Sequence, residues 1–134
     1  MGLILGTNIL IQAERQPGGI RFGNYESHGG LYISAITASE LLVGVHRANA
    51  ADRRLKRLAF VESILTAIPT LAFDLETARL HAEMVAALPK NLTASAFDSL
   101  IAATALRHGF PVLTANPTDF TIFPGLTVIA VQPV

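Results

Sequence analysis

Residues 95–120 read SAFDSLIAATALRHGFPVLTANPTDF, and this stretch decides the fold. It predicts a long helix, a turn at His108-Gly109, a short strand (PVLT), and a second helical turn opened by Asn116-Pro117. Asp98 falls in the first turn of the long helix, and Asp119 falls in the first turn after the strand. Carboxylates at two such helix entrances can gather negative charge along one edge of a sheet. We therefore interpret this edge as a metal site.

The composition is that of a single folded domain spanning residues 1–134. Hydrophobic residues make up 51% of the chain and the mean hydropathy is +0.46, which excludes disorder and favours a sheet buried on both faces. The absence of cysteine excludes a disulfide framework and a thiolate metal site, and it favours a reducing cytoplasm. We expect neither a signal peptide nor a membrane span, because Gly6-Thr7-Asn8 interrupts the first apolar run and no run approaches the about 18 residues that a span needs.

The charges are balanced, so no overall field attracts nucleic acid. Five of the ten basic residues nevertheless fall close together, at Arg47, Arg53, Arg54, Lys56 and Arg57. This basic cluster could contact phosphate, or it could be the solvated face of a helix, and the sequence leaves both readings open.

Strands and helices alternate along the rest of the chain. The expected strands are residues 3–5, 31–34, 111–114 and 126–131, with an edge piece at 68–73. Helices are expected to open at Thr7-Asn8, Thr37 and Asp74, and a longer amphipathic helix carries Leu55, Leu58, Val61 and Leu65 on one face. Residues 16–30 contain five glycines and are expected to be largely loop, with a short helix possible near 20–27. This alternation predicts an α/β fold with a mostly parallel central sheet and helices on both faces.

Three acids share one local pattern, because each follows a helix-capping side chain by three residues. The pairs are Thr37 with Glu40, Ser95 with Asp98, and Asn116 with Asp119. An acid in this place can simply satisfy the N-cap amide and complement the helix dipole by roughly 0.3–1 kcal/mol, and for each acid alone this explanation stays open. Two of the acids, however, enter a helix just after a strand, at the edge where parallel α/β folds bind ligands, and Asp98 can join them if its helix starts there. Crowded carboxylates need a cation or a proton between them, and oxygen ligands without cysteine favour Mg²⁺ or Mn²⁺.

Four segments, in order and spacing, resemble the motifs of the PIN domain and, more narrowly, those of the VapC toxins of bacterial toxin–antitoxin pairs. They are LILGTNILI (3–11), ISAITASELLVGV (33–45), FDSLIAATAL (97–106) and LTANPTDF (113–120). The resemblance implies a PIN-like three-layer α/β/α sandwich and a metal-dependent endoribonuclease, whose acids bind one or two divalent ions and activate water. Carried over by position, the metal-binding and catalytic acids are Glu40, Asp98 and Asp119, and the polar residues lining the site are Thr7, Asn8, Thr114 and Asn116.

The chain departs from this family at Gly6, where the resembled motif has an aspartate directly before Thr-Asn. That aspartate is a metal ligand in the family, and glycine offers no side-chain oxygen, so we expect little or no nuclease activity from this chain. Gly6 could reflect a selected or deliberate inactivation, or natural divergence in a copy that keeps only partner binding. A third explanation is a glycine required for positive φ at the strand-to-helix turn.

The same resemblance implies a homodimer, a small antitoxin of the VapB type, an RNA substrate, and contact with DNA only through the antitoxin. A candidate contact surface is the apolar stripe of Leu41, Leu42, Val45, Leu55 and Leu58, which ordinary core packing explains equally well. Two other functions stay open, a PIN domain that binds RNA or antitoxin without chemistry, and a phosphorylation-receiver domain. The receiver class needs a lysine near its fifth strand, whereas the last lysine of this chain is Lys90.

Overall fold

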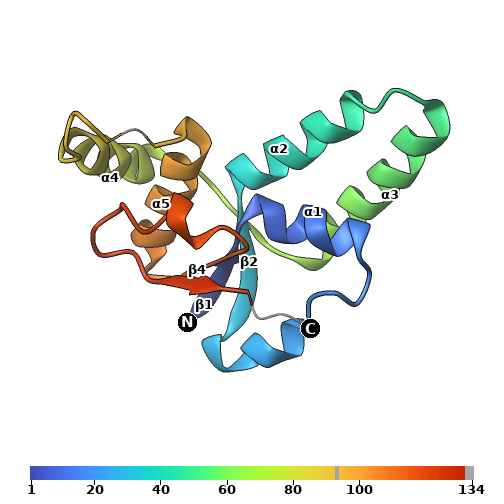
Figure 1. Ribbon diagram of the computed structural model, residues 1–134, viewed down its shortest axis with the longest axis horizontal. Coiled ribbons are helices and arrows are strands. Elements are labelled where there is room, and N and C mark those ends of the chain that lie inside the picture. Colours follow the sequence, from blue (N-terminus) through green and yellow to red (C-terminus); the bar gives the residue numbers. More distant parts are fainter. Residues whose placement is uncertain (93, 132–134) are drawn as a thin grey trace.

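A five-stranded sheet in the order β3-β2-β1-β4-β5 runs through the centre of the molecule (Figure 1). The computed structural model describes residues 1–92 and 94–131. The strands are β1 (Gly2–Leu5), β2 (Gly30–Ser34), β3 (Thr70–Leu71), β4 (Val112–Thr114) and β5 (Val128–Ala130), and each neighbouring pair is parallel. The prediction of a parallel sheet with a short edge strand at 68–73 is confirmed.

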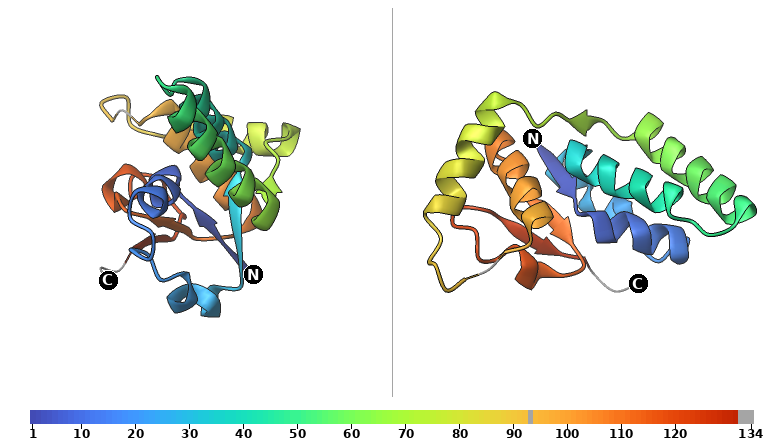
Figure 2. Two further views of the ribbon diagram at one scale, coloured as in Figure 1. Left: turned by 90° about the vertical axis from the view of Figure 1, so that its right-hand side faces the viewer. Right: turned by 90° about the horizontal axis from the view of Figure 1, so that it is seen from above.

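Helices pack on both faces of this sheet. They are α1 (Thr7–Arg15), α2 (Ala35–His46), α3 (Ala51–Ala67), α4 (Leu75–Ala86) and α5 (Ala96–His108), with short 3-10 helices η1 (Phe22–His28) and η2 (Pro117–Asp119). In Figure 1, α4 and α5 lie to the left of the strands, and α1, α2 and α3 lie to the right. Figure 2 shows the α2–α3 hairpin extending outward from the sheet. The predicted three-layer α/β/α arrangement is confirmed.

The two faces of β1 belong to two separate hydrophobic cores. Leu3 and Leu5 join the core under α1, α2 and α3, whereas Ile4 joins the core under α4 and α5. All three side chains are fully buried. Because successive side chains of a strand point to opposite faces, only a strand covered on both sides can be apolar throughout. This burial explains why the first strand reads as an uninterrupted apolar run.

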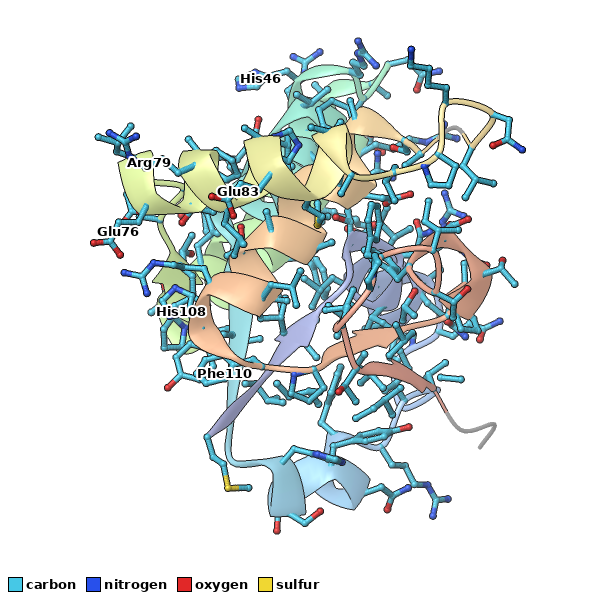
Figure 3. All side chains as sticks on the ribbon, turned by 90° about the vertical axis from the view of Figure 1, so that its left-hand side faces the viewer. His46, Glu76, Arg79, Glu83, His108 and Phe110 are labelled. Carbon is cyan, nitrogen blue, oxygen red and sulfur yellow. The ribbon has the colours of Figure 1, made fainter. Side chains whose placement is uncertain are left out.

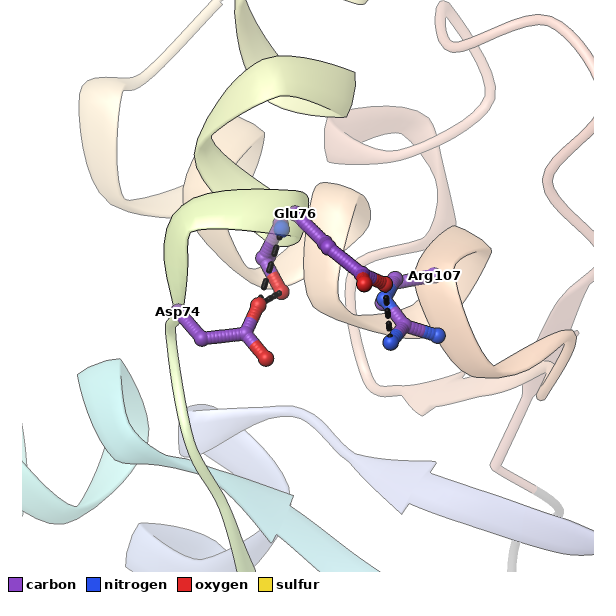
Figure 4. Close-up of polar contacts among 4 residues, drawn as sticks. Asp74, Glu76 and Arg107 are labelled. Carbon is purple, nitrogen blue, oxygen red and sulfur yellow. Dashed lines mark hydrogen bonds and ion pairs between the residues drawn. The ribbon is translucent and has the colours of Figure 1, made fainter.

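Several helix ends follow directly from the sequence. Asp74 caps α4, accepting hydrogen bonds from the backbone N–H of Thr77 at 2.9 Å and from its hydroxyl at 2.8 Å (Figure 4). Arg107 of α5 forms an ion pair with Glu76 of α4, which joins the two helices of this layer. Gly109 ends α5 in the left-handed conformation at φ 70°, as predicted.

The chain leaves α5 through a small aromatic contact at the surface. The rings of His108 and Phe110 lie 5.7 Å apart and nearly parallel, at 28° (Figure 3). This contact holds the start of the segment that leads into β4.

The start of α2 differs from the prediction. Thr37 was expected to be its N-cap, but the helix begins at Ala35 and its cap is Ser34, whose hydroxyl accepts from the Thr37 N–H at 3.0 Å. The physical reason is that β2 runs directly into α2 without a loop, since Ser34 still pairs with Leu71 of β3. Thr37 is therefore a fully buried residue in the first turn, and Glu40 is not part of a capping box.

The apolar stripe divides between core and surface. Leu41 and Val45 are buried in the core, whereas Leu55 is 68% exposed and Leu58 is 37% exposed. For the first two the core explanation holds, Leu42 is half-buried against the same core, and the two α3 residues stay available as a contact surface. The described residues contain no helix that is both long enough and apolar enough to cross a membrane.

The basic cluster makes local contacts along α3. Arg54 donates to the Ala48 carbonyl at 3.0 Å and Arg53 donates to the Asn49 side chain at 3.3 Å. Arg57 donates to the Gly44 carbonyl at 3.3 Å and pairs with Glu14 of α1 at 3.4 Å. These contacts favour the reading of a solvated helix face.

Candidate active site

A small pocket lies beyond the carboxyl ends of β1 and β4. It is lined by Gly6, Thr7, Asn8, Glu40, Asp98, Ile101, Thr114, Asp119 and Phe120. Because the two strands are parallel neighbours, with Leu5 paired to Leu113, the residues that follow them arrive side by side. The Gly6 N–H donates to the Leu113 carbonyl at 2.8 Å, which fixes that junction. Three acids that are distant in the chain therefore meet at one edge of the sheet.

Asp98 is the most perturbed acid of this pocket. Its carboxylate lies in the first turn of α5, where the Ser95 hydroxyl accepts from the Asp98 N–H at 3.4 Å. Partial burial, together with the nearby negative charges of Asp119 and Glu40, raises the pKa of Asp98 to about 6. The acids are thus close enough to repel one another.

A chain of hydroxyl groups holds Glu40 in place. The Thr7 hydroxyl donates to Glu40 Oε1 at 2.7 Å, and Thr7 Oγ1 lies 3.0 Å from Thr37 Oγ1. Ser34 in turn donates to Thr37 Oγ1 at 3.3 Å. Each hydroxyl has one hydrogen, so the hydrogen of Thr7 goes to Glu40 and Thr37 must donate to Thr7. The chain therefore runs in one direction, from buried Ser34 through Thr37 and Thr7 to the carboxylate.

Gly6 has a conformation that any residue can adopt. Its φ is −66° and its ψ is 154°, so the explanation that glycine is needed for a positive φ is wrong. A Cβ at this position would lie 3.3 Å from the Leu113 carbonyl oxygen and 3.7 Å from Thr114 Cβ. A side chain here would need a shift of a few tenths of an ångström and would belong to the same pocket.

Asn116 lies outside the pocket, although it was expected to line it. It lines an adjoining groove together with Asn8, Gln12, Arg15 and Gln16. Its N–H donates to Thr114 Oγ1 at 3.0 Å, so its place beside the groove is fixed. Its own side chain makes no capping hydrogen bond to η2.

The donor set of the pocket fits a hard divalent cation, because carboxylate and hydroxyl oxygens are what Mg²⁺ and Mn²⁺ prefer. The spacing does not provide a finished cage: in residues 1–92 and 94–131, no three His, Cys, Asp or Glu side chains are arranged to hold an ion. The oxygen atoms of the pocket are thus of the kind that binds such a cation, but the acidic side chains present are not arranged to hold one by themselves.

A family model described as PIN domain matches residues 3–123. The chain belongs to the PIN domain family. This excludes the phosphorylation-receiver alternative.

Relatives of this PIN domain include Ribonuclease VapC1 of Rickettsia felis, 40% identical over 98% of both chains. Ribonuclease VapC of Rickettsia bellii is 36% identical over 98% of this chain and 97% of its own. Among solved structures, a DNA-bound VapBC from Salmonella typhimurium superposes with a TM-score of 0.84 and 26% identity, covering 97% of this chain and 98% of that one. The resemblance to VapC ribonucleases is confirmed.

Four of the residues that support the PIN-domain site were not predicted from the sequence as part of it. Ser34 and Thr37 act through hydrogen bonds to residues on other elements, and Ile101 and Phe120 supply apolar walls. A signal for the first pair was present, since both are hydroxyl residues flanking the strand-to-helix junction. Only the position of α1 beside α2 shows that Thr37 faces Thr7 and that Ser34 reaches the site through Thr37.

Proposed function

We propose that this PIN domain is an endoribonuclease toxin of the VapC type that uses Mg²⁺ or Mn²⁺, and that Gly6 leaves this chain weak or inactive. The observation that carries the proposal is the meeting of Glu40, Asp98 and Asp119 in one pocket, with the pKa of Asp98 raised to about 6 by burial and by the other two acids. Such crowding of negative charge is what a divalent cation relieves. The ribonuclease names of the relatives support RNA as the substrate.

The residues of the pocket have different roles in this proposal. Glu40, Asp98 and Asp119 would hold the cation, and Thr7 would keep one oxygen of Glu40 oriented toward it. When bound, such an ion neutralises the scissile phosphate and lowers the pKa of the attacking water. Ile101 and Phe120 limit the water that surrounds the acids, because both side chains are buried. An aspartate at position 6 would add the missing carboxylate.

We also propose a small VapB-type antitoxin as partner, a homodimer, and contact with DNA only through the antitoxin. The VapBC assembly among the structural neighbours supports the antitoxin. Exposed Leu55 and Leu58 on α3 offer apolar area for one of these contacts.

The decisive experiment restores the acid. Purified unchanged chain, Gly6→Asp and Gly6→Asn are incubated with structured RNAs and tRNAs in Mg²⁺ or Mn²⁺. We expect cleavage only with Gly6→Asp, abolished by EDTA and by a second change, Asp98→Ala. Asparagine has the shape of aspartate without its charge, so it controls for mere filling of the pocket.

Two results would contradict the proposal. Cleavage by the unchanged chain, lost in Asp98→Ala, would show that Gly6 does not disable it. A Gly6→Asp protein that is folded yet inert on every RNA would remove the support for a disabled nuclease.

The second candidate is a PIN domain that binds antitoxin or RNA without chemistry. The lack of a three-acid metal cluster among the described residues favours it. It requires that neither the unchanged chain nor Gly6→Asp has a specific Mn²⁺ site, which calorimetric titration measures.

A further inference from the structure

The groove beside the acid pocket has a chemistry unlike that of the pocket. Its polar lining consists of four carboxamides and one guanidinium, from Asn8, Gln12, Gln16, Asn116 and Arg15. Of the described residues that line it, none has a carboxylate. Asn8 lines both the groove and the acid pocket, so the two are continuous. We call this feature the amide groove.

Helical spacing explains how α1 builds one wall. Asn8, Gln12 and Arg15 are separated by four and three positions, so they share one face of the helix, and Gln16 follows as its C-cap residue. Buried Leu10 lies on the opposite side of α1 and buried Ile9 lies on its flank, and both fix the helix on the core. The polar face is therefore held rigidly toward the groove.

The other wall comes from the segment after β4. Thr114 fixes this segment twice, since its hydroxyl accepts from the Asn116 N–H and its carbonyl accepts from the Val131 N–H, both at 3.0 Å. Thr114 itself is 2% exposed and lines the acid pocket. The backbone of Asn116 is thereby held next to Thr114 and so next to the acid pocket.

Arg15 is the cation of the groove. Neither of the two ion pairs recorded for residues 1–92 and 94–131, Arg57 with Glu14 and Arg107 with Glu76, involves it. The chain has no net charge that would attract a polyanion, and the three crowded acids repel one locally, so a nearby cation matters for holding it. Carboxamides, in turn, present a donor and an acceptor together, which matches the edges of nucleobases.

We propose that the amide groove binds the unpaired nucleotides next to the phosphate that is cleaved, with Arg15 on a backbone phosphate and the amides of Gln12 and Asn116 on base edges. This inference rests on the proposed ribonuclease function and adds to it the residues that contact the nucleotides flanking the cleaved phosphate. In duplex RNA the Watson–Crick edges are paired, the major groove is too narrow for side chains, and the shallow minor groove is recognised mostly by shape, so this lining suits unpaired bases.

The test is RNA binding without chemistry. Fluorescently labelled single-stranded oligoribonucleotides of equal length and different base composition are titrated with the unchanged chain in EDTA, and anisotropy is followed at several salt concentrations. Variants Arg15→Gln, Gln12→Ala, Gln12→Glu and Asn116→Ala are compared with it. Controls are Arg79→Gln, which removes a charge from the outer surface of α4 (Figure 3), and Asn24→Asp, which adds one on exposed η1.

We expect Arg15→Gln to weaken binding of every oligonucleotide by about fivefold and to lower the slope of log K against log salt by about 0.7, the value for one phosphate contact on a single strand. Gln12→Ala and Asn116→Ala should leave the slope unchanged and alter the ratio of affinities between base compositions. Gln12→Glu should weaken binding more than Gln12→Ala, because it places a carboxylate beside the phosphate. The two controls should stay within about twofold of the unchanged chain.

The proposal is overturned if Arg15→Gln and Gln12→Glu bind as the unchanged chain does, if the controls weaken binding equally, or if duplex RNA of the same sequence competes as well as the single strand. Absence of any RNA binding by the unchanged chain also overturns it. The Gly6→Asp background separates an error in the groove proposal from an error in the proposed ribonuclease function. If Gly6→Asp and Gly6→Asp combined with Arg15→Gln cleave RNA with the same kcat/KM, the ribonuclease function stands and the groove proposal is rejected.

Discussion

At the scale of single residues, the raised pKa of Asp98 reports the cost of bringing three acids together in the pocket. Partial burial first, and the charges of Asp119 and Glu40 next, raise its pKa to about 6 from an ordinary 3.8. The folded state therefore prefers the protonated acid more than the unfolded state does. The resulting contribution to stability is fully present below about pH 3.8 and is lost as the pH rises through about 6.

Removing this charge should stabilise the protein at neutral pH. Without metal, we expect the free energy of unfolding of Asp98→Asn, relative to the unchanged chain, to rise by about 1–2 kcal/mol between pH 4 and pH 7.5, after allowance for solvent screening. Urea unfolding at each pH, in EDTA, measures it. Asp52→Asn removes a helix-N-terminal acid from an exposed site on α3, so the excess seen for Asp98→Asn reports the pocket. A difference that stays flat with pH would contradict the crowding of the acids.

At the scale of elements, the hydroxyl chain joins α1 to α2. Thr37→Val removes the hydroxyl that donates to Thr7 and accepts from Ser34, and it keeps the shape of the side chain. We expect a loss of about 1–3 kcal/mol in stability, because buried Ser34 and half-buried Thr7 each lose a hydrogen-bond partner. In the Gly6→Asp background we also expect weaker Mn²⁺ binding, since Thr7 no longer orients Glu40 firmly.

Matched variants separate positioning from plain destabilisation. Thr37→Ser keeps the hydroxyl and should retain the Mn²⁺ affinity while losing some packing. Thr104→Val removes a fully buried hydroxyl that donates to Leu100 within α5, at 2.9 Å, away from the chain. In calorimetry, Thr104→Val should bind Mn²⁺ with the same affinity as the Gly6→Asp parent. An equal loss of Mn²⁺ affinity in Thr37→Val and Thr104→Val would refute a positioning role for Thr37.

The same elements show how far the sequence reaches. Asp74, Ser95 and Gly109 identified helix ends correctly, because caps and left-handed glycines act through bonds within a few residues of the chain. Thr37 matched a capping box equally well and is not a cap. The end of β2 is set by its pairing with β3, and this pairing joins residues that are far apart in the sequence. Glu40 and Asp119 were found by their position after strands and Asp98 by its place in the first turn of a helix, whereas Asn116 lies in the neighbouring groove, where its backbone is bonded to Thr114.

At the scale of the whole molecule, folding and metal binding are linked, because the acids come from separate elements. Glu40 is supplied by α2, Asp98 by α5 and Asp119 by η2, so the unfolded chain has no comparable site. A cation that binds only the folded state stabilises it by mass action, by about 2.7 kcal/mol at a hundredfold its Kd, or roughly 10 °C in Tm for a chain of this size.

Gly6→Asp should therefore lower the melting temperature without metal and raise it with metal. In EDTA we expect the variant to melt below the unchanged chain, because a fourth carboxylate in the pocket and the 3.3 Å approach to the Leu113 carbonyl outweigh the few tenths of a kcal/mol gained from an aspartate N-cap on α1. In Mn²⁺ the order should reverse, with the unchanged chain moving little. Thermal melts of both proteins across a Mn²⁺ titration measure this, and Gly6→Asp combined with Asp98→Asn should lose the metal-dependent rise. Equal rises for the unchanged chain and for Gly6→Asp would mean that position 6 contributes no ligand and that the pocket is complete with glycine.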